Sequence, residues 1–257
     1  PCPLSLRCGT SVLLEAALRH GKRMLHISTD EVYGEIPAGY SAREGDPLRP
    51  RSPYAASKAS ADLLCLGFFT SHQAPVTIVR MTNNFGPYQY PEKAISLFIT
   101  NALEDKPLPV YGQGQQVRDW LYVEDACAAL DLLLQKGESG QVYNVAAQNE
   151  RPNIEVARAI LRVLDKPESL ITFVEDRKAH DQRYSLDWAR VRSLGWKPRH
   201  TFEAALEKTV RWYSKNPQWW RRLKQGEFAD YYARQYGRRF PKGNPRTGDK
   251  RPSERLP

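Results

Sequence analysis

Two short stretches of the sequence hold residues that could do acid–base chemistry, and the first is ISTDEVYGE at residues 27–35. In it, Thr29, Asp30 and Glu31 follow a short apolar run. Two carboxyl groups serve as acid and base only if their surroundings separate their pKa values. Neighbours on a straight strand face opposite sides, so this arrangement requires an irregular strand end. The alternative is that Asp30 and Glu31 only cap the next helix.

The second stretch is SPYAASK at residues 52–58, in which Tyr54 and Lys58 are four residues apart. On a helix this spacing puts both side chains on one face. A phenol with its ordinary pKa of about 10 is a poor base at neutral pH, but a neighbouring ammonium lowers that pKa. Lys58 could therefore activate Tyr54 and also hold a ribose hydroxyl. The YxxxK pattern is common by chance in helices, so its value as evidence for a catalytic site depends on the strand that precedes it.

The elements that would position these residues alternate between strands and helices. Apolar residues three and four apart predict a helix over 11–20, which Gly21 ends. Short apolar runs predict strands over 24–28 and 76–81, with a helix over 53–69 between them. This alternation predicts an α/β fold with a parallel sheet. After a loop, the same patterns predict helices over 94–104, 123–134, 154–164 and 202–215, and strands over 108–112, 141–146 and 170–174.

The composition is that of a globular chain with an excess of basic residues. Of the 257 residues, 41% are hydrophobic, which suffices for a core, and the net charge is +9. Such a charge suggests an anionic partner, although much of it lies in the C-terminal tail, whose end we expect to be poorly packed. No apolar run could span a bilayer, and we find no signal peptide, so we expect a cytoplasmic protein. The four cysteines form no CxxC pair and no metal-ligand spacing, so we expect reduced thiols and no metal at Cys2, Cys8, Cys65 and Cys127.

Four motifs in order carry a resemblance to a known family: STDEVYG, YAASK, TNNFGPYQYPEK and VYGQGQQVRDWLYVEDA. Together they resemble the extended short-chain dehydrogenase/reductases and, among them, the dTDP-glucose 4,6-dehydratases. The likeness runs from about Gly9 to about Gly237. Epimerases and nucleotide-sugar decarboxylases share YxxxK and the loop that follows, but usually have other residues in place of Thr29, Asp30 and Glu31. A UDP-sugar epimerase or decarboxylase is therefore the nearest alternative.

The resemblance implies the NAD-dependent dehydration of dTDP-glucose to dTDP-4-keto-6-deoxyglucose. NAD would take a hydride from C4 of the sugar while Tyr54, assisted by Lys58, takes the hydroxyl proton, and Thr29 would bond O4. Glu31 would then remove the C5 proton and Asp30 would protonate the departing C6 hydroxyl, before the hydride returns to C6. Because the acid must hold its proton at neutral pH, we expect Asp30 to be the more shielded carboxyl.

Further site residues are implied by position in the same motifs. Ser28 and Asn84, with Tyr54 and Lys58, would contact the cofactor. Arg118 would bind the diphosphate, because a guanidinium meets two phosphate oxygens at once. The implied substrate contacts are Thr29, Asn83, Lys93, Ala94, Pro109, Val110, Tyr111, Arg118, Asn144, Arg177 and His180. The sequence has Lys178-Ala179 where the family usually has Pro-Gly between that arginine and histidine.

The resemblance also implies a domain organisation. We expect the C-terminal part of a Rossmann-type NAD domain over 1–82 and 113–150, and a smaller mixed α/β substrate domain over 83–112 and 151–224, followed by a basic tail over 225–257. A homodimer would form through the helix over 11–20 and the helix that carries Tyr54. No nucleic acid and no membrane would be bound.

One family feature is not found in this sequence. A Rossmann-type enzyme holds the cofactor pyrophosphate on a glycine-rich turn, GxGxxG or GxxGxxG, after its first strand. No such motif follows an apolar strand here. We therefore expect a truncated chain that, taken alone, binds NAD⁺ poorly and has little activity. The remaining alternative is a non-catalytic, basic nucleotide- or nucleic-acid-binding fragment that uses arginines beside Trp212, Tyr213, Trp219 and Trp220.

Overall fold

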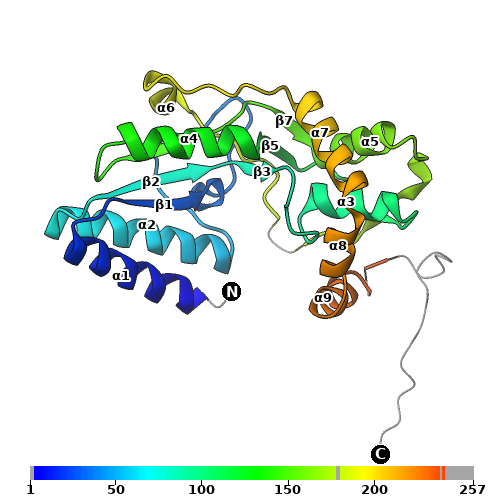
Figure 1. Cartoon of the computed structure of the whole chain (residues 1–257), viewed down its shortest axis with the longest axis horizontal. Coiled ribbons are helices and arrows are strands. Elements are labelled where there is room, and N and C mark those ends of the chain that lie inside the picture. Colours follow the sequence, from blue (N-terminus) through cyan, green and yellow to red (C-terminus); the bar gives the residue numbers. More distant parts are fainter. Residues whose placement is uncertain (1–2, 178–179, 238, 241–257) are drawn as a thin grey trace, which may run out of the picture. The chain divides into compact units, whose positions relative to one another are not determined.

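A computed structural model of the chain describes residues 3–177, 180–237 and 239–240, with side chains from Gly9 onward. The chain forms two compact units, each built from separate stretches of sequence (Figure 1). Unit 1 lies within residues 1–87, 115–153 and 178–209, and unit 2 within 88–114, 154–177 and 210–257. None of the described helices is both long and apolar enough to cross a membrane.

Unit 1 contains the predicted parallel sheet. Its strands are β1 (Met24–Thr29), β2 (Val76–Met81) and β6 (Val142–Val145), in the order β1-β2-β6 and all parallel. Helices α1 (Pro3–His20) and α2 (Pro53–His72) cover one face, and α4 (Val123–Lys136) covers the other (Figure 1). Burial on both faces explains why β2 is buried at every position. The carboxyl ends of the three strands meet at one edge of the sheet.

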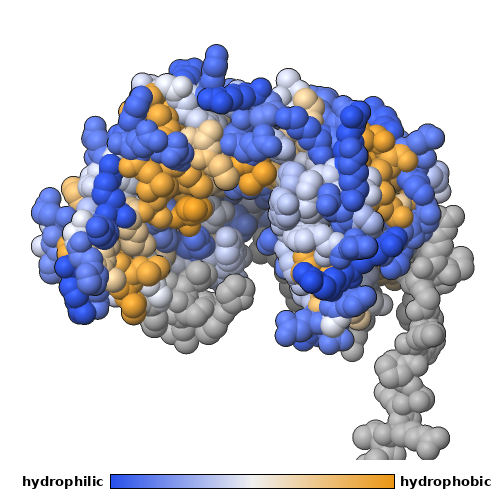
Figure 2. Space-filling model, in the orientation of Figure 1, coloured by the Kyte–Doolittle hydropathy of each residue, from blue (hydrophilic) through white to orange (hydrophobic). Residues whose placement is uncertain are grey.

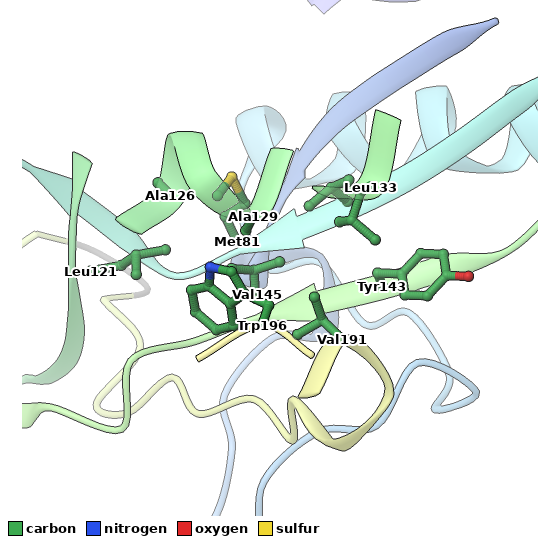
Figure 3. Close-up of a cluster of buried hydrophobic side chains, with 10 residues drawn as sticks. Met81, Leu121, Ala126, Ala129, Leu133, Tyr143, Val145, Val191 and Trp196 are labelled. Carbon is green, nitrogen blue, oxygen red and sulfur yellow. The ribbon is translucent and has the colours of Figure 1, made fainter. Parts of the chain in front are cut away.

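The core between the sheet and α4 is shown in Figure 3. Ala126, Ala129 and Leu133 lie on one side of α4 and face residues of β2 and β6. The Trp196 indole joins this cluster and donates from Nε1 to the Asp125 carbonyl oxygen at 3.1 Å. The short helix α6 (Ala189–Ser193) adds its buried Val191. Small residues on α4 thus allow the helix to approach the sheet closely.

Strand β1 lies at the edge of this sheet, and its outer side chains are partly exposed. Ile27 is 48% exposed although it sits in the middle of the strand. Leu134 on α4 is exposed to the same extent, and Figure 2 shows apolar surface gathered around α4 and the strands below it. An exposed edge strand is able to pair with another strand.

A second, mixed sheet in unit 1 joins β3 (Asn83–Phe85), β5 (Val117–Tyr122) and β7 (Glu150–Pro152). The sequence did not predict β5, because its charged residues Arg118 and Asp119 break the apolar pattern. Both are buried in the structure. The Asp119 carboxylate accepts hydrogen bonds from three successive backbone amides, at Ala147, Gln148 and Asn149.

Unit 2 is built around a two-stranded parallel sheet of β4 (Leu108–Tyr111) and β8 (Ile171–Val174). Its helices are α3 (Ala94–Leu103), most of α5 (Asn153–Val163), the end of α7 (Phe202–Lys215), α8 (Pro217–Leu223) and α9 (Glu227–Tyr236). Tyr213 and Trp220 are fully buried, and Trp212 packs its ring against Tyr88 and Trp219. These aromatic residues form part of the packing of unit 2.

One expectation about the C-terminal half needs correction, and one helix there was not predicted. Residues 180–209 pack with unit 1, whereas the sequence-based division assigned them to the substrate domain; the Arg183 guanidinium pairs there with both oxygens of Glu150 at 2.7 Å. The start of the basic tail forms α9, a helix that the sequence did not predict, and this helix buries Phe228 and Tyr236 against Leu97. Residues 241–257, Cys2 and the Cys8 side chain lie outside the described part of the chain, while Cys65 and Cys127 are free thiols.

Candidate active site

The Thr29–Glu31 turn lies where β1 ends at the carboxyl edge of the sheet. A short 3₁₀ helix, η1 (Asp30–Tyr33), follows the strand directly. The Thr29 hydroxyl donates to Oδ1 of Asp30 at 3.1 Å, and its oxygen accepts from the Glu31 amide at 3.3 Å. Thr29, and neither of the two carboxylates, is therefore the cap of the turn. The irregular strand end that the acid–base interpretation required is present.

Asp30 and Glu31 have different surroundings. Asp30 is only 3% exposed, whereas Glu31 is half-buried. Burial, reinforced by the negative charge of Glu31, raises the pKa of Asp30 from the ordinary 3.8 to about 7, although Arg118 and the Thr29 hydrogen bond oppose this. The expectation that Asp30 is the more shielded carboxyl is confirmed. At neutral pH this carboxyl holds its proton much of the time, as a general acid must.

Tyr54 and Lys58 lie one turn apart near the start of α2, which packs against η1. Ser52 caps this helix by accepting from the Ala55 amide at 3.0 Å, and Pro53 opens its first turn. The Tyr54 ring is 46% exposed. The Lys58 ammonium is half-buried and donates from Nζ to the Ile27 carbonyl oxygen at 2.5 Å. The ammonium is therefore anchored to the exposed edge of β1.

The expected lowering of the Tyr54 pKa by Lys58 is not found. Burial raises the pKa of Tyr54, and the carboxylates of Glu31 and Asp30 raise it further. The Lys58 charge is directed to the β1 carbonyl instead, and burial lowers the pKa of Lys58 itself. The two carboxyl groups and the phenol nevertheless interact electrostatically, which places Tyr54 beside the Thr29–Glu31 turn.

The polar residues predicted on neighbouring strands divide into two groups. Ser28 is buried on β1, and Asn83 and Asn84 are half-buried on β3. Within the described residues, Oδ1 of Asn83 and Oγ1 of Thr82 are buried without a hydrogen-bond partner. Such atoms are suited to a polar ligand, since a buried polar group is normally bonded.

Asn144 differs from these residues, because its side chain belongs to the core. It is 0% exposed, its Oδ1 accepts from the Tyr33 hydroxyl at 2.9 Å, and its Nδ2 donates to the Ala42 carbonyl oxygen at 2.9 Å. The resemblance implied that Asn144 contacts the nucleotide, and this expectation is corrected because the side chain is enclosed in the core. Asn144 connects three segments of unit 1.

Arg118 is a buried residue of β5 with partners from its own unit. Its guanidinium donates to the carbonyl oxygens of Val117 and Asp181, both at 2.8 Å, and lies 4.3 Å from the ring centroid of Tyr184. The cation is thus close enough to oppose the raised pKa of Asp30. His180 is half-buried and begins the segment held by Arg118, while Lys178 and Ala179 lie outside the described residues.

The remaining predicted residues lie in unit 2. Lys93 is exposed at the position that caps α3, and Ala94 is the first residue of that helix. Pro109 and Val110 are buried on β4, and the half-buried Tyr111 ends this strand. The Arg177 guanidinium carbon lies 5.0 Å from the Tyr111 ring centroid. Unit 2 therefore brings Tyr111 and Arg177 together, whereas Lys93 and Ala94 belong to another element.

Sequence reasoning did not find every residue around the Thr29–Glu31 turn. The phenol of Tyr184 is buried, donates to Oδ2 of Asp181 at 2.7 Å, and has a pKa raised by burial and by Glu31. Asp62 and Arg80 form a buried ion pair behind the turn. No local spacing indicated that pair, because Asp62 lies on α2 and Arg80 on β2. None of the described residues forms a group of three His, Cys, Asp or Glu side chains that could hold a metal.

A parallel sheet that ends in a Thr-Asp-Glu turn, beside a helix with YxxxK, defines a class of sugar-nucleotide enzymes. The chain belongs to the family described as GDP-mannose 4,6 dehydratase, whose model matches residues 6–209. Its relatives include a dTDP-glucose 4,6-dehydratase of Actinoplanes sp., which is 50% identical over 214 residues, 82% of this chain and 67% of that protein. The resemblance to the dTDP-glucose 4,6-dehydratases is therefore confirmed. The chain spans about two thirds of the length of such curated relatives.

Solved structures show the same fold. A dTDP-glucose 4,6-dehydratase from Bacillus anthracis, in complex with NAD, matches with a TM-score of 0.81 and 46% identity over 84% of this chain and 70% of that one. A UDP-glucose 4-epimerase from Thermus thermophilus, in complex with NAD, matches with a TM-score of 0.76 and 30% identity over 81% of this chain and 69% of that one. The Rossmann-like α/β fold expected from the sequence is confirmed.

Proposed function

We propose that this chain carries the acid–base residues of a dTDP-glucose 4,6-dehydratase, a lyase that forms dTDP-4-keto-6-deoxyglucose. The observation that supports this most directly is the asymmetry of the Thr29–Glu31 turn. Asp30 is buried with a pKa of about 7, and Glu31 beside it is more accessible. Removal of water from a sugar needs one group that gives a proton and one that takes a proton. The turn supplies both within two residues.

Each residue of the turn has a step that matches its surroundings. The Thr29 hydroxyl bonds O4 of the glucose ring. Tyr54, which is assigned on the resemblance because its surroundings raise its pKa, takes the proton of the C4 hydroxyl. A carbonyl at C4 then acidifies the C5 hydrogen, which the accessible carboxylate of Glu31 removes. Asp30 gives its retained proton to the hydroxyl that leaves C6. The buried acid and the more accessible base thus act on adjacent carbon atoms.

The cofactor in this proposal is NAD, which when bound would accept a hydride from C4 and return it to C6. The residues present fit the nicotinamide ribose end of this cofactor. Lys58 is fixed by its hydrogen bond to Ile27 within one turn of Tyr54, and Ser28 is buried on the neighbouring strand. Oδ1 of Asn83, which has no hydrogen-bond partner among the described residues, offers an acceptor directly before Asn84 in the sequence.

For the nucleotide, we propose the part of unit 2 around Tyr111. Arg177 stacks over its ring and carries a positive charge suited to phosphate. The buried neighbours Pro109 and Val110 would present an apolar strand to the base. Lys93, Ala94 and His180 are assigned to substrate binding on the resemblance alone. Arg118 is assigned as a fixed positive charge beside the acid–base turn.

A test can use residues of this chain without any redox step. In dTDP-4-keto-6-deoxyglucose the C5 hydrogen lies next to the C4 carbonyl and is therefore acidic. In D₂O, the purified chain should catalyse its exchange for deuterium, which NMR of the sugar follows directly. Glu31→Gln should slow this exchange by about 10²- to 10⁴-fold, the usual contribution of a positioned base.

Glu35→Gln is the matched control, because Glu35 lies in the same segment but pairs with Arg51 at the surface. This variant should exchange at the wild-type rate. Exchange no faster than in buffer, or equal loss in both variants, would refute the assignment. Because this chain is expected to bind NAD⁺ weakly, dTDP-glucose is added with a large excess of NAD⁺; any product of a dehydratase has lost one water, whereas an epimerase would leave the mass unchanged.

We further propose that the protein works in the cytoplasm as a homodimer. Support for the dimer comes from α1 and α2, which pack together and expose Val12, Leu13 and Leu63 to between 59% and 63%. Support for the compartment comes from the free thiols of Cys65 and Cys127. Light scattering on the purified chain tests the dimer, and Leu13→Glu should reduce its mass to that of a monomer.

A further inference from the structure

Behind the Thr29–Glu31 turn, unit 1 buries a set of charged and polar side chains that the proposed chemistry does not use. Asp62 is 0% exposed, Arg80 2% and Tyr33 3%. Nε of Arg80 donates to Oδ2 of Asp62 at 2.8 Å, and its Nη1 donates to the Tyr33 hydroxyl oxygen at 2.7 Å. A buried ion pair is weak evidence for stability, because apolar residues of similar volume often serve as well. The presence of this pair therefore calls for another explanation.

The set continues to the third strand of the sheet. The Tyr33 hydroxyl donates to Oδ1 of Asn144, so that it bridges Arg80 on β2 and Asn144 on β6. Arg80 and Asn144 are direct neighbours in the strand register, and Ser28 of β1 is the neighbour of Arg80 on its other side. We call Asp62, Arg80, Tyr33 and Asn144 the Arg80 network.

Both charges of the ion pair are retained in the core. Burial by itself would raise the pKa of Asp62, but hydrogen bonding by His26 and the charge of Arg80 outweigh it, so the pKa is lowered. Burial would likewise lower the pKa of Arg80, but Tyr33 and Asp62 raise it. An ionised pair with several hydrogen bonds has a defined geometry, unlike an apolar contact that can repack.

The Arg80 network connects the two segments that carry the proposed catalytic groups. Asp62 lies on α2, four residues after Lys58 and eight after Tyr54. Tyr33 is the last residue of η1, the turn that begins with Asp30. Each segment is therefore attached to the same guanidinium, one through a carboxylate and the other through a phenol.

We propose that Asp62, Arg80 and Tyr33 are positioning residues, which hold the turn of Asp30 and Glu31 in register with the helix of Tyr54 and Lys58. The inference rests on the proposed function for the roles of those four residues. A misplacement of about 1 Å can reduce a catalysed rate by about 100-fold. Because two catalytic segments meet at one side chain, a single lost hydrogen bond can move one of them relative to the other.

Tyr33→Phe is the most informative variant, because it removes one hydroxyl and keeps the ring in the core. Replacing Arg80 or Asp62 would leave a buried charge without its partner, and such a chain could fail to fold. The matched control is Val79→Ala, on the opposite face of β2, where Val79 is fully buried among apolar residues. Both variants should lower the melting temperature.

Two measurements separate positioning from stability. The first is the pKa of Asp30, followed by NMR of its carboxyl carbon while its charged neighbours Glu31, Arg118 and Asp119 stay in place. Tyr33→Phe should lower this pKa by about one pH unit or more, because a displaced turn admits water to the carboxyl. The second is the C5 exchange rate, which should fall by about 10- to 100-fold with KM little changed.

Val79→Ala should leave both quantities at their wild-type values. The proposal is overturned if Tyr33→Phe also leaves them unchanged, or if Val79→Ala shifts them equally. Absence of C5 exchange in the wild-type chain would instead contradict the proposed function. The pKa of Asp30 would still decide whether the Arg80 network holds the turn.

Discussion

Replacing Asp30 by asparagine keeps the shape of the buried side chain and removes its ability to ionise. In the folded chain burial raises the pKa of Asp30 to about 7, against 3.8 for an exposed aspartate. At a pH between these two pKa values, Asp30 keeps its proton in the folded chain and has lost it in the unfolded chain. The stability from this proton is fully present below the unfolded pKa, and it is lost as the pH rises through the folded pKa.

The size of this effect follows from the two pKa values. They differ by about three pH units, and each unit corresponds to roughly 1.4 kcal/mol, so the wild-type chain should lose about 4 kcal/mol between about pH 4 and pH 8 from this group. Asp30→Asn has no proton to lose. Its unfolding free energy, relative to wild type, should therefore rise by about 4 kcal/mol over the same range.

Urea unfolding of both chains at a series of pH values measures this difference. Titrating groups that do not interact with Asp30 are common to the two chains and cancel when one free energy is subtracted from the other. A difference that stays constant within about 1 kcal/mol would refute the reasoning, because it would mean that Asp30 ionises as freely in the folded chain as in the unfolded one. Its assignment as the acid would then have no electrostatic support.

Three further predictions concern the frame and the cofactor. Gly34→Ala should destabilise the chain by about 2 kcal/mol or more in urea unfolding, because Gly34 has φ +76° and a Cβ there would lie 2.3 Å from the Arg49 carbonyl oxygen; wild-type stability would contradict this turn geometry. Ile160→Ala, at a fully buried position of α5, should cost about 2–5 kcal/mol, and a much smaller loss would mean that the site collapses around the cavity. The 257-residue chain should bind NAD⁺ only weakly in calorimetry, because the sequence contains no glycine-rich pyrophosphate motif, and a Kd below about 10 μM would contradict this.

The parallel sheet and its helices were predictable from the sequence, because apolar periodicity reports burial directly. The strand β2 and the helix α2 fall where their patterns placed them. The strand β5 was missed for a physical reason. Its Arg118 and Asp119 are buried only because carbonyl and amide groups distant in sequence satisfy them, and no local pattern reveals such partners.

The turn that holds the proposed acid–base residues was also predictable, but its environment was only partly so. An irregular strand end and a shielded Asp30 followed from what the chemistry requires, and both are present. The partner of Lys58 did not follow, because the ammonium reaches a backbone carbonyl that the spacing of YxxxK cannot indicate. Asn144 was assigned by position in a motif, and only the packing of three segments shows that it is enclosed.

The helix α9 shows a signal that was present and not used. Phe228, Tyr232 and Tyr236 recur every four residues, which is the spacing of a helix with one apolar face. In the structure these rings pack in series, with centroids 6.0 Å and 4.8 Å apart. This periodicity predicts a helix, and the sequence-based division left the segment within the basic tail instead.

The side chains of Tyr54, Lys58 and Asp62 follow a line along α2 that winds slowly around the helix. An α-helix has 3.6 residues per turn, so each step of four residues advances the direction of the side chain by about 40°. The exposed fraction accordingly falls from 46% at Tyr54 to 0% at Asp62. One additional residue between Lys58 and Asp62 would rotate one end of the line by about 100° against the other. The three positions between Lys58 and Asp62 therefore admit changes of residue but no change in their number, and deep mutational libraries should show insertions there to be far more damaging than substitutions.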